Sequence, residues 1–265
     1  MELKEKIFNE KNNNFAEETK LKNPVTMKKN SLLALSMIWF AYFLIITIAF
    51  ASLIVWQQKA IVSFIEKHIN EFAFLIITIT LFIAFFVLSI IISFFSHKMS
   101  KGWLISVLTF FALFWGILLI PIINHFLSQP IAKSLALLLI PSVTMLLVGI
   151  LAYFNVINFS KVWPIIIAIS IALGIVILIT FLTNDSFVQR KLNLLIAVLG
   201  FIIIVLYMGI DFMLISKRGR FIEEYDVQVE KDFLMKQGIL FGFHLATDFI
   251  VLIRYTLVIL NSLKN

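Results

Sequence analysis

Long apolar runs without a formal charge follow one another along this chain and decide what it can fold into. Seven segments are long enough to cross a membrane core, which needs about 20 helical residues. They comprise residues 31–58, 72–96, 103–124, 134–160, 162–184, 192–216 and 238–263. Hydrophobic residues make up 61% of the sequence and charged residues 14%, whereas soluble domains contain about 45–50% and 25%. We therefore predict an all-α polytopic membrane protein with seven transmembrane helices.

The chain divides into two parts by composition. Residues 1–30 are polar and rich in Lys, Glu and Asn, and they contain no apolar segment of the kind found in a signal peptide. We expect a cytoplasmic tail there, followed by a transmembrane domain at 31–265. Residues 124–130, NHFLSQP, concentrate turn-forming residues and predict a loop between the third and fourth helices.

The distribution of Lys and Arg predicts the orientation of the chain. With the N-terminus inside, twelve Lys and Arg residues near the ends of the spans lie inside and six lie outside. Cytoplasmic loops carry an excess of these residues, so the N-terminus is expected in the cytoplasm and the C-terminus outside. Because these charges orient the chain and meet anionic lipid, the lipid bilayer is the predicted partner and nucleic acid is not.

No pattern in the sequence indicates an enzyme or a resident cofactor. The chain has no Cys, which excludes thiolate metal sites and cysteine nucleophiles. It also lacks a phosphate-binding Gly loop and a His cluster with metal spacing. An intramembrane aspartyl protease would need Gly at positions 208 and 210, where this chain has Met208 and Ile210. We therefore expect no enzymatic activity.

Two aspartates within apolar segments are the candidate functional residues. Of fifteen acidic residues, thirteen fall in solvated segments, while Asp211 and Asp248 lie in the sixth and seventh helices. An ionised carboxylate at membrane depth costs roughly 3 kcal/mol on insertion scales, so such a residue indicates a function. The two helices run antiparallel, so we predict that both side chains face one polar interior and that the charged seventh helix is central. Alternatively, each aspartate serves only to bond a neighbouring backbone, and Asp211 is near enough to its helix end to reach the membrane surface.

Four further side chains are candidates for supporting the pair. Tyr207 precedes Asp211 by four residues, and His244 precedes Asp248 by four. Side chains at this spacing share one face of a helix. Tyr255 and Arg254 follow Asp248 by seven and six residues, and the arginine is therefore about 120° away around the helix.

Three segments of the chain resemble the transmembrane Bax-inhibitor-motif family. Residues 130–154 resemble its central stretch, in which a small polar turn leads into a long helix. Residues 192–211 are similar to its sixth helix, where a Gly stands eleven residues before an Asp, as Gly200 does before Asp211. TDFIVLI, residues 247–253, resembles the seventh-helix sequence Leu-Asp-Phe-Ile-Asn-Leu-Phe. The resemblance covers most of residues 31–263 and implies a bacterial-type member in the cell membrane.

The sequence departs from the family pattern around the first aspartate. Ile210, Phe212 and Met213 replace Tyr, Thr and Gln of the family motif, and the second apolar segment lacks the basic residue associated with its aspartate pair. A second alignment is possible, because residues 225–228 in the predicted loop 217–237 imitate the Tyr-Asp-Thr-Gln motif and would make Asp226 the counterpart. The gapless match of the sixth helix favours Asp211.

The resemblance implies a pH-sensitive leak of calcium or another cation, gated by Asp211 and Asp248. Two carboxylates in a low-dielectric site cannot both ionise cheaply, so they tend to share one proton and titrate as a pair. Calcium prefers about six to eight oxygen ligands, so two aspartates are expected to bind it only weakly and transiently, and no other cofactor is expected. The alternative is a non-conducting membrane regulator that binds other membrane proteins, such as a membrane protease.

Overall fold

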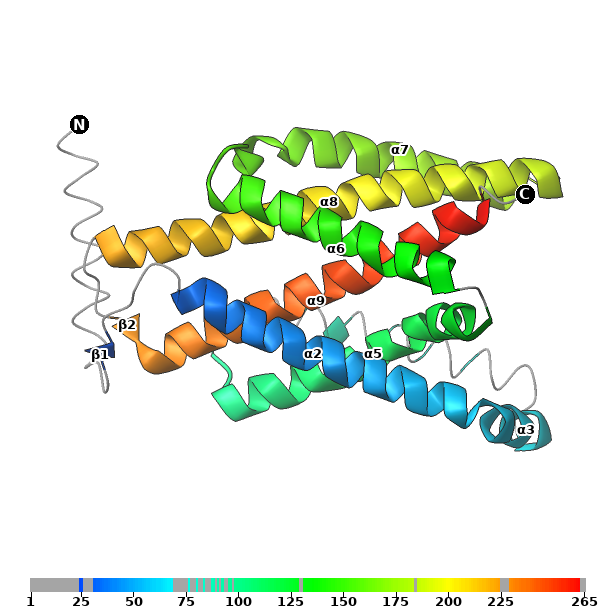
Figure 1. Ribbon diagram of the computed structural model, residues 1–265, viewed down its shortest axis with the longest axis horizontal. Helices are drawn as coiled ribbons and strands as arrows, with labels where there is room; N and C mark the ends of the chain where they lie inside the picture. Colours follow the sequence, from blue (N-terminus) through cyan, green and yellow to red (C-terminus); the bar gives the residue numbers. More distant parts are fainter. Residues whose placement is uncertain are drawn as a thin grey trace.

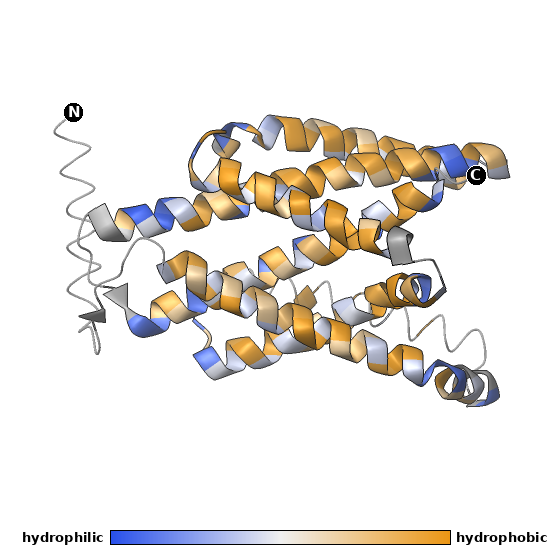
Figure 2. Cartoon of the chain, in the orientation of Figure 1, coloured by the Kyte–Doolittle hydropathy of each residue, from blue (hydrophilic) through white to orange (hydrophobic). Residues whose placement is uncertain are grey.

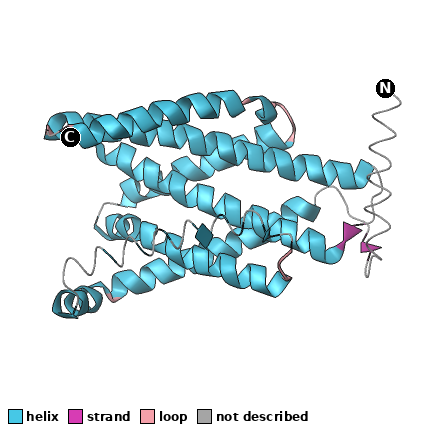
Figure 3. Ribbon diagram, turned by 180° about the vertical axis from the view of Figure 1, so that it is seen from behind, coloured by secondary structure: helices cyan, strands magenta, loops and turns pink. Residues whose placement is uncertain are grey.

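The structure is a computed structural model that describes residues 24–25, 31–68, 98–128, 131–183, 185–224 and 229–262, together with single residues between 76 and 96. Within these residues the chain is helical apart from one short sheet (Figure 1). The helices are α2 (Ser31–Trp56), α3 (Gln58–His68), α5 (Lys101–Ser128), α6 (Ile131–Tyr153), the 3-10 helix η1 (Phe159–Lys161), α7 (Trp163–Leu182), α8 (Ser186–Glu224) and α9 (Lys231–Ser262). The antiparallel strands β1 (Pro24–Val25) and β2 (Val229–Glu230) lie together at one end of the bundle (Figure 3).

Six helices in the described residues are long and apolar enough to cross a membrane, namely α2, α5, α6, α7, α8 and α9. Hydrophobic residues cover most of their length, and hydrophilic residues gather toward the ends of the bundle (Figure 2). This is the architecture of a polytopic all-α membrane protein. The predicted span at 72–96 falls almost entirely outside the described residues, so the described part of the chain accounts for six spans and not seven.

Several predicted loops are wrong because helices continue into them. α8 extends to Glu224 and α9 begins at Lys231, so most of residues 217–237 is helical. Lys, Arg and Glu are good helix formers, and a helix that leaves the membrane can continue with these residues solvated. The 39 residues of α8 span about 58 Å, well beyond a hydrocarbon core of roughly 30 Å. Similarly, α5 continues to Ser128, past the predicted loop start at Asn124, and residues 58–68 form α3.

Helix α9 packs against four other described helices, α2, α5, α6 and α8. It runs between α2 and α5 on one side and α6 and α8 on the other (Figure 1). Glycines allow the closest approach to α2, since a Cβ added at Gly242 would lie 2.5 Å from the Cβ of Trp39, and one added at Gly238 would lie 2.5 Å from the Cγ of Leu35. Small residues permit such close contacts between membrane helices. This position shields the helix that carries Asp248 from lipid.

Candidate functional site

Asp211 lies in the part of α8 that packs against α9. Its side chain is 16% exposed, and its neighbours Met208, Phe212 and Met213 are buried. The helix continues for thirteen residues beyond Asp211, to Glu224. The carboxylate is therefore turned into the bundle and does not lie at a solvated helix end.

His244 of α9 faces Asp211 across the contact between the two helices. Its Nδ1 lies 3.8 Å from Oδ2 of Asp211, a distance at which the groups attract each other when the imidazole is protonated. Asp211 is thirteen residues before Glu224, and His244 is thirteen residues after Lys231. Because the helices run antiparallel, these two side chains have the same depth. His244 is 55% exposed, so the site reaches the surface of the protein at this edge.

Asp248 stands one turn further along α9, about 6 Å beyond His244. It is close enough to Asp211 for their charges to repel each other. Its Oδ2 is buried and has no hydrogen-bond partner in the described structure, and the same holds for Oγ1 of the adjacent Thr247. The two aspartates predicted from the sequence therefore lie near each other, together with a histidine from the same helix as Asp248.

A buried carboxylate oxygen without a partner constrains the chemistry of this site. If Asp248 ionises there, it loses its hydration without gaining a compensating hydrogen bond, which costs several kcal/mol. A bound proton removes this cost, and so does a water molecule or cation that reaches the oxygen. The arrangement can therefore exchange a proton for a cation.

The other three predicted supporting residues have different surroundings. The ring of Tyr207 packs edge-on against Trp163 of α7, with 6.1 Å between the ring centroids. The ring of Tyr255 covers Gly200, where an added Cβ would lie 2.3 Å from the Cζ of the tyrosine. Arg254 lies on the exposed side of α9 and forms no ion pair with an acidic residue in the described ranges. Sharing a helix face with an aspartate did not place these side chains in its site, because each contacts whichever helix is adjacent at its own depth.

The described residues contain no group of three His, Asp or Glu side chains arranged to hold a metal ion. Asp211 and Asp248 supply carboxylate oxygens, but calcium takes about six to eight oxygen ligands. A calcium ion at this pair would keep most of its water. Weak, transient binding is the chemistry that these two residues can support.

A polar contact that the sequence did not reveal lies one to two turns beyond Asp211. Ser216 is buried, and its Oγ donates a hydrogen bond to the carbonyl of Tyr153 at 2.7 Å. The same Oγ accepts a hydrogen bond from Nη2 of Arg220 at 2.9 Å. These bonds join α8 to the end of α6 on the side of the bundle where α8 and α9 connect.

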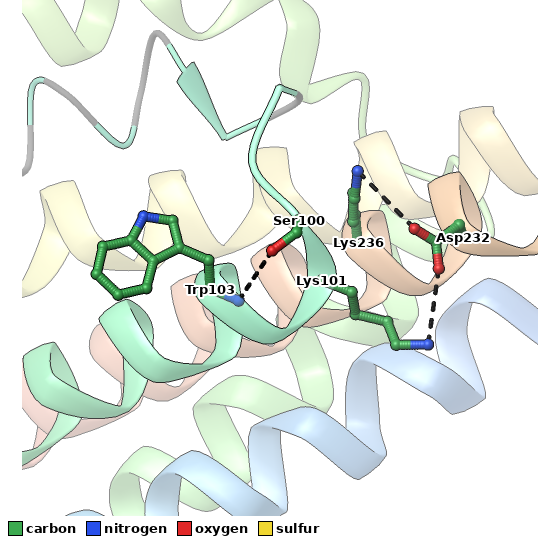
Figure 4. A network of polar contacts seen from close by, with 5 residues as sticks. All are labelled: Ser100, Lys101, Trp103, Asp232 and Lys236. Carbon is green, nitrogen blue, oxygen red and sulfur yellow. Dashed lines mark hydrogen bonds and ion pairs between the residues drawn. The ribbon is translucent and has the colours of Figure 1, made fainter.

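An ion-pair network fixes the start of α5 beside the start of α9 (Figure 4). Asp232, in the first turn of α9, lies 3.6 Å from Nζ of Lys101 and 3.9 Å from Nζ of Lys236. Ser100 accepts a hydrogen bond from the backbone N–H of Trp103 at 3.4 Å, which caps the first turn of α5. The side chains of Asp232 and Lys101 are nearly half exposed, so the pair contributes less than about 1 kcal/mol.

The alternative alignment concerns a segment outside the described residues. Asp226 belongs to residues 225–228, which separate the end of α8 from β2. The geometry above therefore bears on Asp211 and leaves Asp226 as an alternative for experiment.

Comparison with known proteins does not place the chain in a family. No model of a protein family matches the sequence, and no curated protein is detectably similar to it. The site is therefore interpreted from its own residues.

Proposed function

We propose that this protein is a pH-sensitive leak pathway for calcium or another cation, gated by Asp211 and Asp248. One observation carries the proposal: two carboxylates from adjacent helices meet within candidate membrane spans, and an oxygen of one is buried without a partner. Acidic residues within membrane helices commonly mark ion pathways and proton relays. The resemblance of residues 192–211 and 247–253 to Bax-inhibitor-motif proteins supports the same function.

Proton occupancy provides the gate in this proposal. With one proton shared, the pair carries a single negative charge, and α8 and α9 stay packed together. When the pH rises and this proton is lost, two negative charges repel each other, attract water and favour a cation. The protonated form is therefore the closed one, and flux increases with pH. A protonated His244 offsets part of the negative charge at Asp211 and belongs to the same device.

The proposal includes a seventh span and a defined orientation. The Nδ2 of Asn124, late in α5, donates a hydrogen bond to Oε1 of Gln58 at 3.3 Å, so α3 begins at the far end of α5 from Lys101. The described residues on either side of 69–97 thus lie at opposite ends of the bundle, which supports a further crossing by residues 72–96. The excess of Lys and Arg at one end supports a cytoplasmic N-terminus and an external C-terminus in a bacterial cell membrane.

Calcium flux into proteoliposomes that enclose a calcium-sensitive dye tests this function. We expect influx through the purified protein to rise with pH, and Asp211→Asn to change that dependence because Asn cannot ionise. Asp226→Asn is the control, since a solvated carboxylate should matter little, and it also tests the alternative alignment. If folded protein conducts at no pH, the leak is contradicted and the non-conducting regulator is favoured, whose partner can be sought by cross-linking in membranes.

A further inference from the structure

Helix α3 follows α2 after a single residue but takes a different direction. The N–H of Gln57 bonds to the carbonyl of Leu53, and the N–H of Ile61 bonds to the carbonyl of Gln57, each at 3.0 Å. Helical hydrogen bonding therefore continues across the junction. α2 is seen from the side and α3 nearly end-on in Figure 1, so the chain turns sharply here. α3 leaves the direction of the membrane-crossing helices at the point where α2 ends.

The residues of α3 separate into an apolar side and a polar side. At about 100° per residue, Ile61 lies on the opposite side of the helix from Lys59 and Ser63. Ile61 is 38% exposed and Phe64 is 60% exposed, so the bundle leaves much of the apolar side uncovered. With 11 residues α3 is far shorter than the roughly 20 needed to cross a membrane. A short amphipathic helix of this kind is suited to the boundary between lipid and water.

Two neighbouring residues place this helix at the end of the membrane spans. Trp56, the last residue of α2, is 79% exposed, and tryptophan is enriched at the membrane–water interface. Gln58 at the start of α3 is held by the hydrogen bond from Asn124, near the polar end of α5. α3 is thereby fixed at the depth where two candidate spans, α2 and α5, meet water.

We propose that α3 lies in the plane of the membrane surface and binds a bilayer that contains anionic phospholipid. Ile61 and Phe64 enter the lipid, and Lys59 and Lys67 extend to the headgroups, where each lysine gains about 1 kcal/mol from anionic lipid. The bilayer is continuous with the lipid that surrounds α2, so it reaches the exposed side of α3 without a separate partner. This contact sets the depth of α2, against which α9 packs. The proposal does not depend on cation flux.

Single cysteines introduced at Ile61 and Ser63, about 200° apart around α3, test the proposal. The chain has no native Cys, so each variant carries one fluorescent label. The labelled full-length protein is reconstituted into vesicles of phosphatidylcholine and phosphatidylglycerol. Quenching is then measured with brominated lipid and with aqueous iodide on both sides of the membrane. Phe64→Cys repeats the apolar-side measurement if Ile61→Cys does not fold, and Trp56→Cys is the positive control for the interface.

We expect the label at position 61 to be quenched by brominated lipid and to lose most of its quenching by iodide, while the label at 63 shows the reverse. Equal quenching at the two positions would overturn the proposal, because α3 would then be surrounded uniformly by water or by lipid. Shielding of position 61 from both quenchers would also overturn it, since protein would then cover the apolar side.

Discussion

Replacing Gly242 with Ala should force α9 away from α2 and destabilise the bundle. A Cβ at this position would lie 2.5 Å from the Cβ of Trp39, 2.7 Å from the backbone N of Phe40 and 2.7 Å from the carbonyl oxygen of Ser36. Non-bonded atoms pack best at about 3.5–4.0 Å, so the helices have to separate by roughly 1 Å. Two of the contacts are backbone atoms, which no side-chain rotation can move. Overpacking of this kind costs about 1–3 kcal/mol, and the better helix propensity of Ala offsets about 1 kcal/mol of it.

Gly174→Ala is the matched control for this substitution. It lies in the middle of α7, where an added Cβ would meet nothing within 4 Å. Unfolding by SDS in detergent micelles, followed by tryptophan fluorescence, measures both variants against the unmodified protein. We expect Gly242→Ala to unfold at a lower SDS fraction and Gly174→Ala at the same or a higher fraction. Equal stability of the two variants would refute the close α2–α9 packing.

Three further substitutions test the site and its surroundings. Asp248→Asn should preserve or improve membrane insertion, measured as the inserted fraction in cells, because an ionised Asp costs roughly 3 kcal/mol at membrane depth; a smaller inserted fraction would contradict this. His244→Gln should move the pH of half-maximal flux upward, since a protonated imidazole favours the ionised form of Asp211 and Gln does not; an unchanged midpoint would show that His244 plays no part. Ser216→Ala should lower stability by about 1 kcal/mol because it removes the hydrogen bond to the end of α6, whereas Ser106→Ala, whose exposed hydroxyl bonds only within its own helix, should change little in the same SDS unfolding assay.

The spans and the aspartates were predictable because both depend on local properties of the sequence. A run of about 20 uncharged residues indicates a membrane helix wherever it packs. An acidic residue inside such a run is costly wherever it points, so Asp211 and Asp248 stood out before their neighbours were known. The packing of α9 against four helices follows the same reasoning, since the helix with the most charge needs the most shielding from lipid.

The partners of each side chain were less predictable because they depend on where helices begin and end. Helices placed at the membrane boundary put Asp211 and Asp248 at different depths. The observed ends at Glu224 and Lys231 instead bring Asp211 level with His244. The contact between Tyr207 and Trp163 involves two different helices, so the periodicity of one helix could not reveal it.

The pH dependence of calcium flux through protein with both Asp211 and Asp248 replaced by Asn tests the central proposal most directly. Asn has nearly the shape of a protonated Asp but cannot ionise, so the repulsion that opens the pathway cannot develop. The account predicts that flux through this variant stays at the low level of the closed form as the pH is raised, while flux through the unmodified protein increases. A double variant that folds, inserts and still shows the same rise of flux with pH would contradict it.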